Sequence, residues 1–232
     1  MDLFYLPKIE SNSSSIIFPK EEAKHISRVL RKKTGDQLRA TNGAGLELTL
    51  ELSKVENHAC HAQVISKTKH TPLPYSLHLA VAPTKNINRF EWVIEKATEI
   101  GVHTITPILC DHSERKIVKI ERLSKIMIAA LKQSQQFFLP TLNPMETFQS
   151  FLSKHTNGLI AHCHPSDKTS LLSIAKKQGD HLILIGPEGD FSLEEIQAAE
   201  ANGYLSIQLG NQRLRTETAA IVACHTIALN AQ

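Results

Sequence analysis

The sequence predicts an α/β protein with a mainly parallel sheet, preceded by a small β-rich module. From about residue 75 onward, apolar runs suited to strands alternate with amphipathic stretches suited to helices, which is typical of a parallel sheet covered on both faces. Residues 1–70 instead combine one basic helix with a strictly alternating run at 46–52, typical of a half-buried strand. Residues 67–74 are polar and contain two prolines, so they suit a linker. We therefore expect two domains, 1–70 and 75–232.

The composition excludes several classes of protein. No run of eighteen apolar residues and no signal-peptide start is present, so we expect a soluble, cytoplasmic protein with no membrane partner. The four cysteines are about fifty or more residues apart, which matches no zinc spacing and favours reduced, buried thiols over a metal site. They are Cys60, Cys110, Cys163 and Cys224. The net charge of +3 is too small to indicate a nucleic-acid partner by itself.

The N-terminal module is predicted to hold strands at 2–7, 37–41, 46–52 and 60–67, and a helix from Pro19 to about residue 33. Helical geometry places three basic side chains on one face of that helix and three apolar ones on the other. The basic residues are Lys24, Arg28 and Arg31, and the apolar ones are Ile26, Val29 and Leu30. Such a row is usually only the solvated side of a helix. Because basic residues recur around it, we favour contact with RNA.

In the second domain, strands and helices are predicted to alternate. The strands are expected at 76–82, 103–109, 158–163, 182–185 and 205–209, and the helices at 88–100, 118–136, near 146, 166–177, 192–203 and 217–230. Ser192 followed by Glu195 is a capping-box pattern that starts one of them. The last helix is apolar nearly all round, so it must be buried, either within one chain or against a partner subunit.

Two glycine-containing bends follow neighbouring predicted strands. The run at 182–185 stops at Gly186-Pro187-Glu188-Gly189, and the strand at 205–209 leads into Gly210. Loops after parallel strands open at the carboxyl edge of the sheet, where open α/β folds bind ligands. Neither bend has the lysine of a phosphate loop, and Glu188 would repel phosphate, so a cationic or uncharged ligand fits better. Either bend alone would be read as an ordinary connection.

Several separated motifs resemble one known family. They are His25, Val29-Leu30-Arg31, Gly35-Asp36, Asn42-Gly43-Ala44-Gly45, Pro83-Thr84-Lys85, Glu95-Lys96-Ala97-Thr98-Glu99-Ile100-Gly101-Val102, Ser113-Glu114-Arg115, Gly186-Pro187-Glu188-Gly189, Leu209-Gly210 and Leu214-Arg215-Thr216-Glu217-Thr218-Ala219. In this order along essentially the whole chain, they resemble the RsmE family of SPOUT-class RNA methyltransferases. The resemblance implies a PUA-like β-barrel domain followed by an α/β domain tied in a deep trefoil knot. It also implies a homodimer that uses S-adenosylmethionine, without a metal, to methylate N3 of one uridine in the decoding region of 16S ribosomal RNA in the small ribosomal subunit.

The resemblance also implies which residues hold the cofactor, on the loops at 161–163, 184–189 and 209–219. Carried over, the cofactor-binding residues are His162, Leu184, Ile185, Gly186, Glu188, Gly189, Leu209, Gly210, Leu214, Thr216, Thr218 and Ala219. His162 and His164 flank Cys163, but without a further cluster a metal site is not indicated.

The chemistry assigns two catalytic candidates. Uracil N3 carries a proton at neutral pH, so a base must remove it or a cation must stabilise the anion. Arg215 is the candidate cation and Glu217 the candidate base, although Arg215 could be a surface arginine and Glu217 a helix-start acid. RNA contacts are expected from Lys24, Arg28, Arg31, Lys85, Arg89 and Arg115, with a solvated loop as the competing interpretation for Arg115.

The chain departs from the family pattern at three places. Gln136 stands where an arginine is frequent, Asp190 where a third glycine is common, and Asp2-Leu3-Phe4 where an arginine usually precedes the first aromatic residue. The first and third put particular RNA contacts in question, and the second tests the loop shape. The alternative functions are a 2′-O-methyltransferase acting on another RNA, an RNA-binding protein without activity, and a nucleotide-dependent enzyme.

Overall fold

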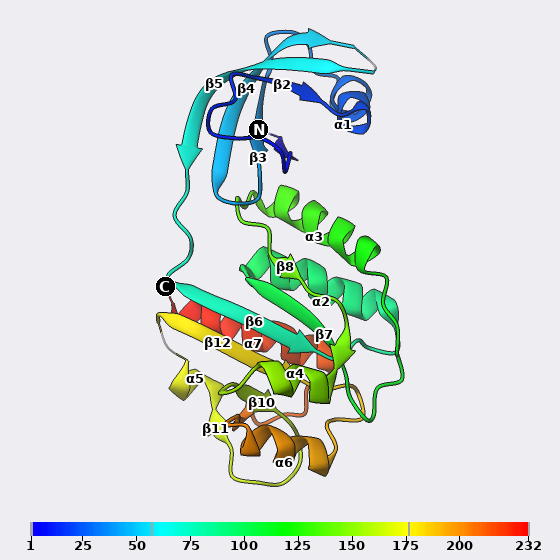
Figure 1. The fold of residues 1–232 in the computed structure, drawn as a ribbon, viewed down its shortest axis with the longest axis vertical. Helices are drawn as coiled ribbons and strands as arrows, with labels where there is room; N and C mark the ends of the chain where they lie inside the picture. Colours follow the sequence, from blue (N-terminus) through cyan, green and yellow to red (C-terminus); the bar gives the residue numbers. More distant parts are fainter. Residues whose placement is uncertain (1, 57, 176, 232) are drawn as a thin grey trace. The chain divides into compact units, whose positions relative to one another are not determined.

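The structure, a computed structural model, describes residues 2–56, 58–175 and 177–231 (Figure 1). It divides into two units, of which the first comprises residues 1–72 and 131–139 and the second residues 73–130 and 140–232. Residues 131–139 were expected in the second domain, 75–232. The structure groups this segment with the first unit, and the contacts described below explain why.

The first unit is built on a five-stranded sheet in the order β1-β3-β4-β5-β2. Its strands are β1 (Leu3–Tyr5), β2 (Ser15–Phe18), β3 (Gln37–Thr41), β4 (Leu46–Val55) and β5 (Cys60–Lys69). β1 runs parallel to β3, and the other neighbours are antiparallel. The alternation expected at 46–52 is present, because Leu48, Leu50 and Leu52 are buried in the core of the unit.

The basic helix is shorter and differently wound than predicted. Helix α1 covers Lys20–Lys24, and the chain continues as a π-helix, η1, over His25–Val29. Leu30 N–H donates to His25 O, five residues back, so each turn holds more residues than the 3.6 assumed. The three apolar residues therefore do not share a face: Ile26 is fully buried, whereas Val29 is 65% exposed. Arg31 has a left-handed backbone (φ 53°) and lies beyond the helix, so the predicted row of three basic residues on one helix is wrong.

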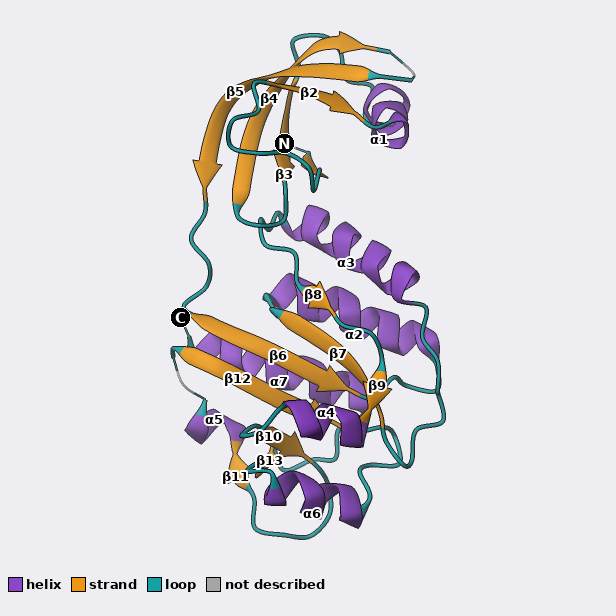
Figure 2. Ribbon diagram, viewed as in Figure 1, coloured by secondary structure: helices purple, strands orange, loops and turns teal. Residues whose placement is uncertain are grey.

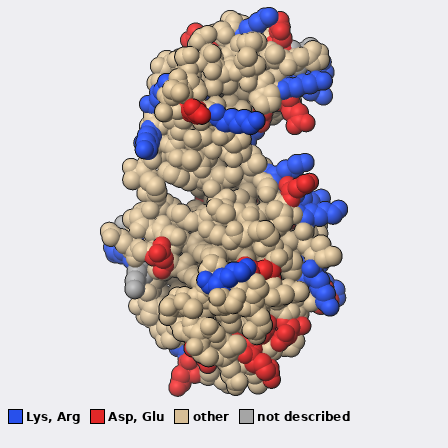
Figure 3. All heavy atoms as spheres, viewed as in Figure 1, with Lys and Arg blue, Asp and Glu red and all other residues tan. Residues whose placement is uncertain are grey.

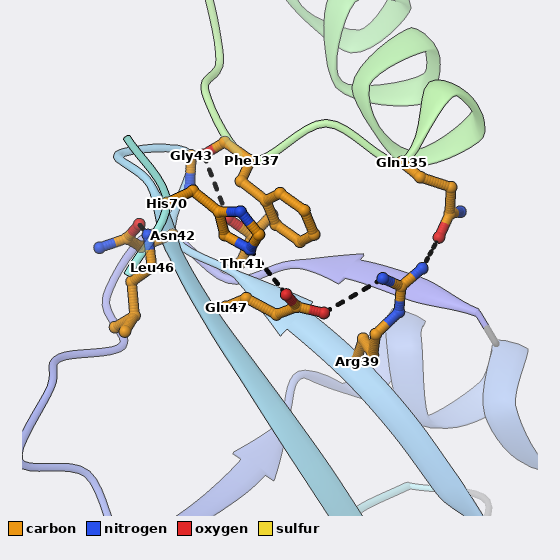
Figure 4. A network of polar contacts seen from close by, with 9 residues as sticks. All are labelled: Arg39, Thr41, Asn42, Gly43, Leu46, Glu47, His70, Gln135 and Phe137. Atoms are coloured by element: carbon orange, nitrogen blue, oxygen red, sulfur yellow. Dashed lines mark hydrogen bonds and ion pairs between the residues drawn. The ribbon is translucent and has the colours of Figure 1, made fainter. Parts of the chain in front are cut away.

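A polar network holds segment 131–139 in the first unit (Figure 4). Arg39 Nη1 pairs with Glu47 Oε1 at 3.1 Å, and its Nη2 donates to Gln135 Oε1. The other carboxylate oxygen of Glu47 lies 2.7 Å from His70 Nε2. The His70 ring stacks on Phe137, with centroids 3.8 Å apart and an angle of 6° between the planes. The Glu47 carboxylate on β4 thus joins Arg39 on β3 to His70 just after β5, and these two residues contact segment 131–139.

Main-chain bonds reinforce this attachment. Gly45 N–H donates to Phe137 O (2.9 Å), and Leu139 N–H donates to Gly43 O (2.8 Å). Gly45 has φ +87°, and a Cβ there would lie 2.5 Å from the ring of Phe138. Glycine is therefore required at residue 45 both for the backbone conformation and for the close approach of the segment.

The second unit contains an eight-stranded sheet whose main path has the order β11-β13-β10-β12-β6-β7-β8, with β9 paired to β7 (Figure 2). Every recorded pairing is parallel, which confirms the predicted mainly parallel sheet. The strands are β6 (Tyr75–Val81), β7 (Thr104–Leu109), β8 (Thr141–Leu142), β9 (Glu146–Thr147), β10 (Leu159–Ala161), β11 (Thr169–Ser170), β12 (Gly179–Ile185) and β13 (Leu205–Gln208). The helices are α2 (Ile87–Ile100), α3 (Ile120–Ser134, whose last residues belong to the first unit), α4 (Phe148–Lys154), α5 (Leu171–Ile174), α6 (Leu193–Ala201) and α7 (Thr216–Asn230).

The predicted start of α6 is confirmed and the predicted helix at 166–177 is not. Ser192 and Glu195 form the complete capping box that their spacing indicates. In the other segment only 171–174 is helical, after the short strand β11, and residue 176 lies outside the described residues. Residues 162–168 form an irregular loop, in which Lys168 Nζ donates to the carbonyls of His162 (3.0 Å) and His164 (2.8 Å). No helix among the described residues is long and apolar enough to span a membrane.

Candidate active site

The two glycine bends lie at the same edge of the sheet, as predicted. Strand β10 pairs with β12 on one side and β13 on the other, all in parallel, so the loops that follow these three strands leave the sheet together. They enclose a cavity of about 880 Å³, within the size range of cofactor sites. Its wall consists of Arg89, Ala161, His162, Cys163, Lys168, Ile185, Gly186, Pro187, Glu188, Asp190, Ile207, Gln208, Leu209, Gly210, Asn211, Gln212, Arg213, Leu214, Arg215, Thr216 and Ala219.

Most residues predicted to bind a cofactor line this cavity. Three do not: Leu184 is fully buried in the core, and neither Gly189 nor Thr218 contributes to the wall. Several wall residues were not named as cofactor-binding, among them Lys168 and Arg213. Arg213 lies in the expected cofactor loop 209–219, whereas Lys168 lies outside all three expected loops and no motif spacing indicates it.

Packing within the protein leaves little room for a side chain at the glycines of the first bend. A Cβ at Gly186 would lie 3.0 Å from the ring of Phe191, and one at Gly189 would lie 2.9 Å from His112 Cβ. Contacts within the protein therefore favour glycine at both residues, most strongly at Gly189. Gly210, in the second bend, has φ +156° and open space where a Cβ would be, so backbone conformation accounts for glycine there.

Glu188 ties the first bend to the loop after β6. Its Oε1 accepts from Lys85 N–H at 3.0 Å. Arg115, half-buried, holds the same loop from the other side: its Nε donates to Thr84 O (3.0 Å) and its Nη2 to Lys85 O. The Lys85 ammonium is exposed and pairs with Glu114 at 2.7 Å. Of the predicted RNA-binding residues, Arg115 thus has a structural role, and Lys85 is exposed at this edge.

His162 lies between the cavity and a chain of polar contacts that runs through buried Ser206 to exposed Glu200. Its Nε2 is 3.0 Å from Ser206 Oγ, and Ser206 Oγ–H donates to Glu200 Oε1 at 2.7 Å. Because the hydroxyl proton of Ser206 is used by the carboxylate, the Ser206 oxygen accepts from His162, whose Nε2 therefore carries the hydrogen. Burial, followed by the charge of Lys168, lowers the pKa of His162 below its ordinary value. His162 is therefore held neutral in the wall of a site where a cationic ligand is expected.

The two catalytic candidates lie at the beginning of α7. Arg215 occupies the N-cap position, and its exposed side chain lines the cavity without capping the helix. Glu217 does not line the cavity. It is buried, its Oε1 pairs with Arg89 Nη1 at 3.4 Å, and its Oε2 has no hydrogen-bond partner. Arg89, predicted to contact RNA, therefore lines the cavity as the ion-pair partner of the candidate base.

Among the basic residues predicted to contact RNA in the first unit, Lys24, Arg28 and Arg31 all have exposed side chains. On the face of the molecule drawn in Figure 3, Lys and Arg side chains are interspersed with Asp and Glu side chains, as the small net charge suggests. No single positive field on that face indicates where RNA binds.

All four cysteines are free, and three are buried as predicted, but Cys163 is exposed in the cavity wall. Burial raises the pKa of the Cys224 thiol to about 12. Within the described ranges no group of three or more His, Cys, Asp or Glu side chains could hold a metal ion.

Comparisons with known proteins agree with this architecture. A family model described as RNA methyltransferase domain matches residues 71–228, and one described as RNA methyltransferase PUA domain matches residues 18–65. The ribosomal RNA small subunit methyltransferase E of Rickettsia conorii is 30% identical over 226 residues, which cover 96% of this chain and 92% of that protein. The protein of the same name from Bacillus subtilis is 29% identical over 227 residues, which cover 90% of this chain and 87% of that protein.

Solved structures give the same result. A probable rRNA-methyltransferase from Porphyromonas gingivalis superposes with a TM-score of 0.90 and 37% identity over 99% of both chains. The ribosomal RNA small subunit methyltransferase E of Neisseria gonorrhoeae, bound to S-adenosyl methionine, superposes with a TM-score of 0.85 and 27% identity, over 97% of this chain and 95% of that chain. The chain therefore belongs to the ribosomal RNA small subunit methyltransferase E family, with an N-terminal PUA-like domain and a C-terminal RNA methyltransferase domain.

Proposed function

We propose that this protein uses S-adenosylmethionine to methylate N3 of one uridine in the decoding region of 16S ribosomal RNA. The observation that carries the proposal is the cavity enclosed by the loops after β10, β12 and β13, in a chain that belongs to a family of ribosomal RNA methyltransferases. Its place of action would be the cytoplasm. The deep trefoil knot implied by the resemblance remains a prediction.

The cavity fits the cofactor in size and chemistry. Its wall contains the acidic residue Glu188, which suits the positively charged sulfonium, and the basic residues Arg89, Lys168, Arg213 and Arg215, which suit the carboxylate of the cofactor. The related protein from Neisseria gonorrhoeae was solved with S-adenosyl methionine. The residues that would hold the cofactor here are His162, the main chain at 185–188 and the main chain at 209–216. When bound, it supplies an electrophilic methyl group on a sulfonium centre.

The chain's own residues must make N3 of uracil nucleophilic. Arg215, exposed at the cavity, can place its guanidinium against a uracil carbonyl oxygen and stabilise the anion that forms when N3 loses its proton. Glu217 is poorly placed as the first acceptor of that proton, since it lies outside the cavity wall and pairs with Arg89. We assign it instead the positioning of Arg89, which does line the cavity. We assign the removal of the N3 proton to solvent water, which has access to the cavity.

We further propose that the active form is a homodimer. Helix α7 is apolar nearly all round, yet this chain buries only one side of it, including Ala220, Ala223 and Ile227. Leu229 remains 55% exposed, and Ile221 is half-buried. A second copy covering the other side would account for a helix of this composition. Sedimentation equilibrium giving the mass of a single chain at micromolar concentration would exclude the dimer.

Mass spectrometry of nucleosides tests the reaction. Small ribosomal subunits lacking this modification, and protein-free 16S RNA, are incubated separately with the protein and S-adenosylmethionine, and the digested nucleosides are analysed. We expect 3-methyluridine, and comparison of the two substrates shows whether the assembled subunit is needed. A methyl group on a ribose 2′-oxygen would replace the N3 assignment by the 2′-O alternative. Cofactor uptake without any methylated nucleoside in either substrate would favour an RNA-binding protein without activity.

A further inference from the structure

Among the described residues of the cavity wall, Asp190 is the one acidic residue whose two carboxylate oxygens both accept hydrogen bonds from main-chain N–H groups. Oδ2 accepts from Cys163 N–H at 2.7 Å, and Oδ1 accepts from Phe191 N–H at 2.9 Å. Cys163 follows β10, whereas Asp190 follows β12, so the first bond connects two of the three loops that form the cavity. A second bond between the same loops, from His164 Nε2 to Phe191 O, measures 2.9 Å.

The backbone of Asp190 is adapted to this task. Its φ of 66° lies in the left-handed region, which costs little for Asp but is unfavourable for most side chains. Its N–H donates to Pro187 O at 2.9 Å and closes the turn. Its carbonyl oxygen lies 3.1 Å from His112 Nδ1, on the loop after β7. Through its side chain and its main chain, Asp190 therefore contacts two other loops at the carboxyl edge of the sheet.

We propose that Asp190 is a positioning residue that fastens the loop after β10 to the loop after β12, and thereby holds the cofactor cavity in its binding-competent shape. The proposal rests on the function given above. Both carboxylate oxygens of Asp190 are already engaged, so it acts on the cofactor through the position of the loops and not as a ligand. Without the Asp190 hydrogen bonds, only a fraction of the molecules would have the two loops in the arrangement that binds the cofactor. The apparent dissociation constant of the cofactor then rises by the inverse of that fraction.

The test uses the full-length protein with Asp190→Gly and Asp190→Asn. Glycine tolerates the left-handed backbone, so Asp190→Gly removes the two bonds without imposing backbone strain. Asparagine also tolerates it but keeps only one acceptor, and its NH2 group faces the other N–H donor. The matched control is Asp167→Asn, an exposed acid that does not line the cavity, which removes one negative charge from the loop after β10. Dissociation constants of S-adenosylmethionine and S-adenosylhomocysteine are measured by calorimetry.

We expect Asp190→Gly to weaken both ligands by about tenfold or more and by the same factor, as the loss of a charge-assisted hydrogen bond implies. Asp190→Asn should lie between this variant and the wild type, and Asp167→Asn should bind as the wild type does. In a methylation assay, KM for the cofactor should rise while kcat at saturating cofactor changes less than threefold. Hydrogen exchange of the Cys163 amide should accelerate in Asp190→Gly without added ligand.

Three results would overturn the proposal. One is unchanged affinity in Asp190→Gly; the second is unchanged protection of the Cys163 amide. The third is weakening of the cationic ligand alone with S-adenosylhomocysteine unaffected, which would make Asp190 a direct electrostatic partner. If the wild-type protein takes up neither ligand, the proposed function fails as well. Wild-type binding together with an unaffected variant refutes only the role of Asp190.

Discussion

Replacing Arg215 by alanine should abolish most of the methyl transfer while leaving the fold and the cofactor affinity nearly intact. The side chain is exposed, makes no capping bond to α7, and lines the cavity. The main-chain bond at this position, from Ala219 N–H to Arg215 O at 2.7 Å, does not depend on the side chain. We therefore expect the free energy of unfolding to change by less than about 0.5 kcal/mol.

The magnitude for catalysis follows from the role assigned to Arg215. Removing one preorganised donor from a developing oxyanion costs about 10²–10³ in kcat, or roughly 3–4 kcal/mol of transition-state stabilisation. Arg215→Lys keeps the charge but not the planar fork and should recover only part of the loss. Arg213→Ala is the matched control, since Arg213 is also an exposed arginine of the cavity wall, two residues earlier in the same loop.

The assay measures transfer of a labelled methyl group to small ribosomal subunits at saturating cofactor, with calorimetry of S-adenosylmethionine in parallel. Arg215→Ala should show a dissociation constant within about twofold of the wild type and at least hundredfold slower transfer, whereas Arg213→Ala should lose much less. Transfer above a third of the wild-type rate in Arg215→Ala would remove this residue from the mechanism. An equal loss in both variants would indicate a general effect of positive charge on RNA binding.

Three further predictions follow from the structure. Gly189→Val should lower the free energy of unfolding by about 1–3 kcal/mol and weaken cofactor binding, because its side chain would collide with His112; unchanged titration heats would contradict this. Reversing the charge of Arg28 and Arg31 should weaken RNA binding and flatten the dependence of the binding constant on salt concentration. Filter binding at several salt concentrations measures both effects, and an unaltered salt dependence would assign the first unit another role. Burial and His155 lower the pKa of His78 to about 4. Since the unfolded chain takes up this proton near pH 6.5, the free energy of unfolding should fall as the pH falls from 6.5 toward 4. We expect a loss of about 1 kcal/mol at pH 5, after allowance for partial exposure of the ring. Urea unfolding of the wild type and of His78→Asn at pH 7 and 5 measures this loss, and equal losses in both proteins would refute it.

The parallel sheet and the shared edge of the two glycine bends could be predicted because both depend on local patterns. An apolar run that ends in glycine predicts a strand and the position of the loop that follows it. Parallel pairing then brings these loops together at the carboxyl edge of the sheet. The winding of the basic helix could not be predicted in this way. Its apolar positions fit a 3.6-residue period, and only the bond from Leu30 to His25 shows that the turn is wider. The consequence is the exposure of Val29, which a helical wheel places on the buried side.

Long-range contacts account for the other differences. Segment 131–139 was assigned to the second domain, where it begins in the predicted helix at 118–136. In the structure, its Phe137 stacks on His70 and its Gln135 bonds to Arg39, 96 residues earlier (Figure 4). The side chain that requires glycine at residue 189 is His112, on a loop 77 residues away from it in sequence. No pattern within a window of sequence carries this information, because the partners meet only after the sheet has formed.

The charged residues of the site loops also have partners that are distant in sequence, and these partners determine their roles. From the sequence, Glu188 was expected to repel phosphate and Arg115 to contact RNA. In the structure, Glu188 accepts from Lys85 N–H and Arg115 donates to the carbonyls of Thr84 and Lys85. Asp190 likewise accepts from Cys163 N–H. These charged side chains therefore shape the loops through hydrogen bonds to the main chain. A site built this way is ordered before the cofactor arrives, and less binding free energy is then consumed in ordering the loops.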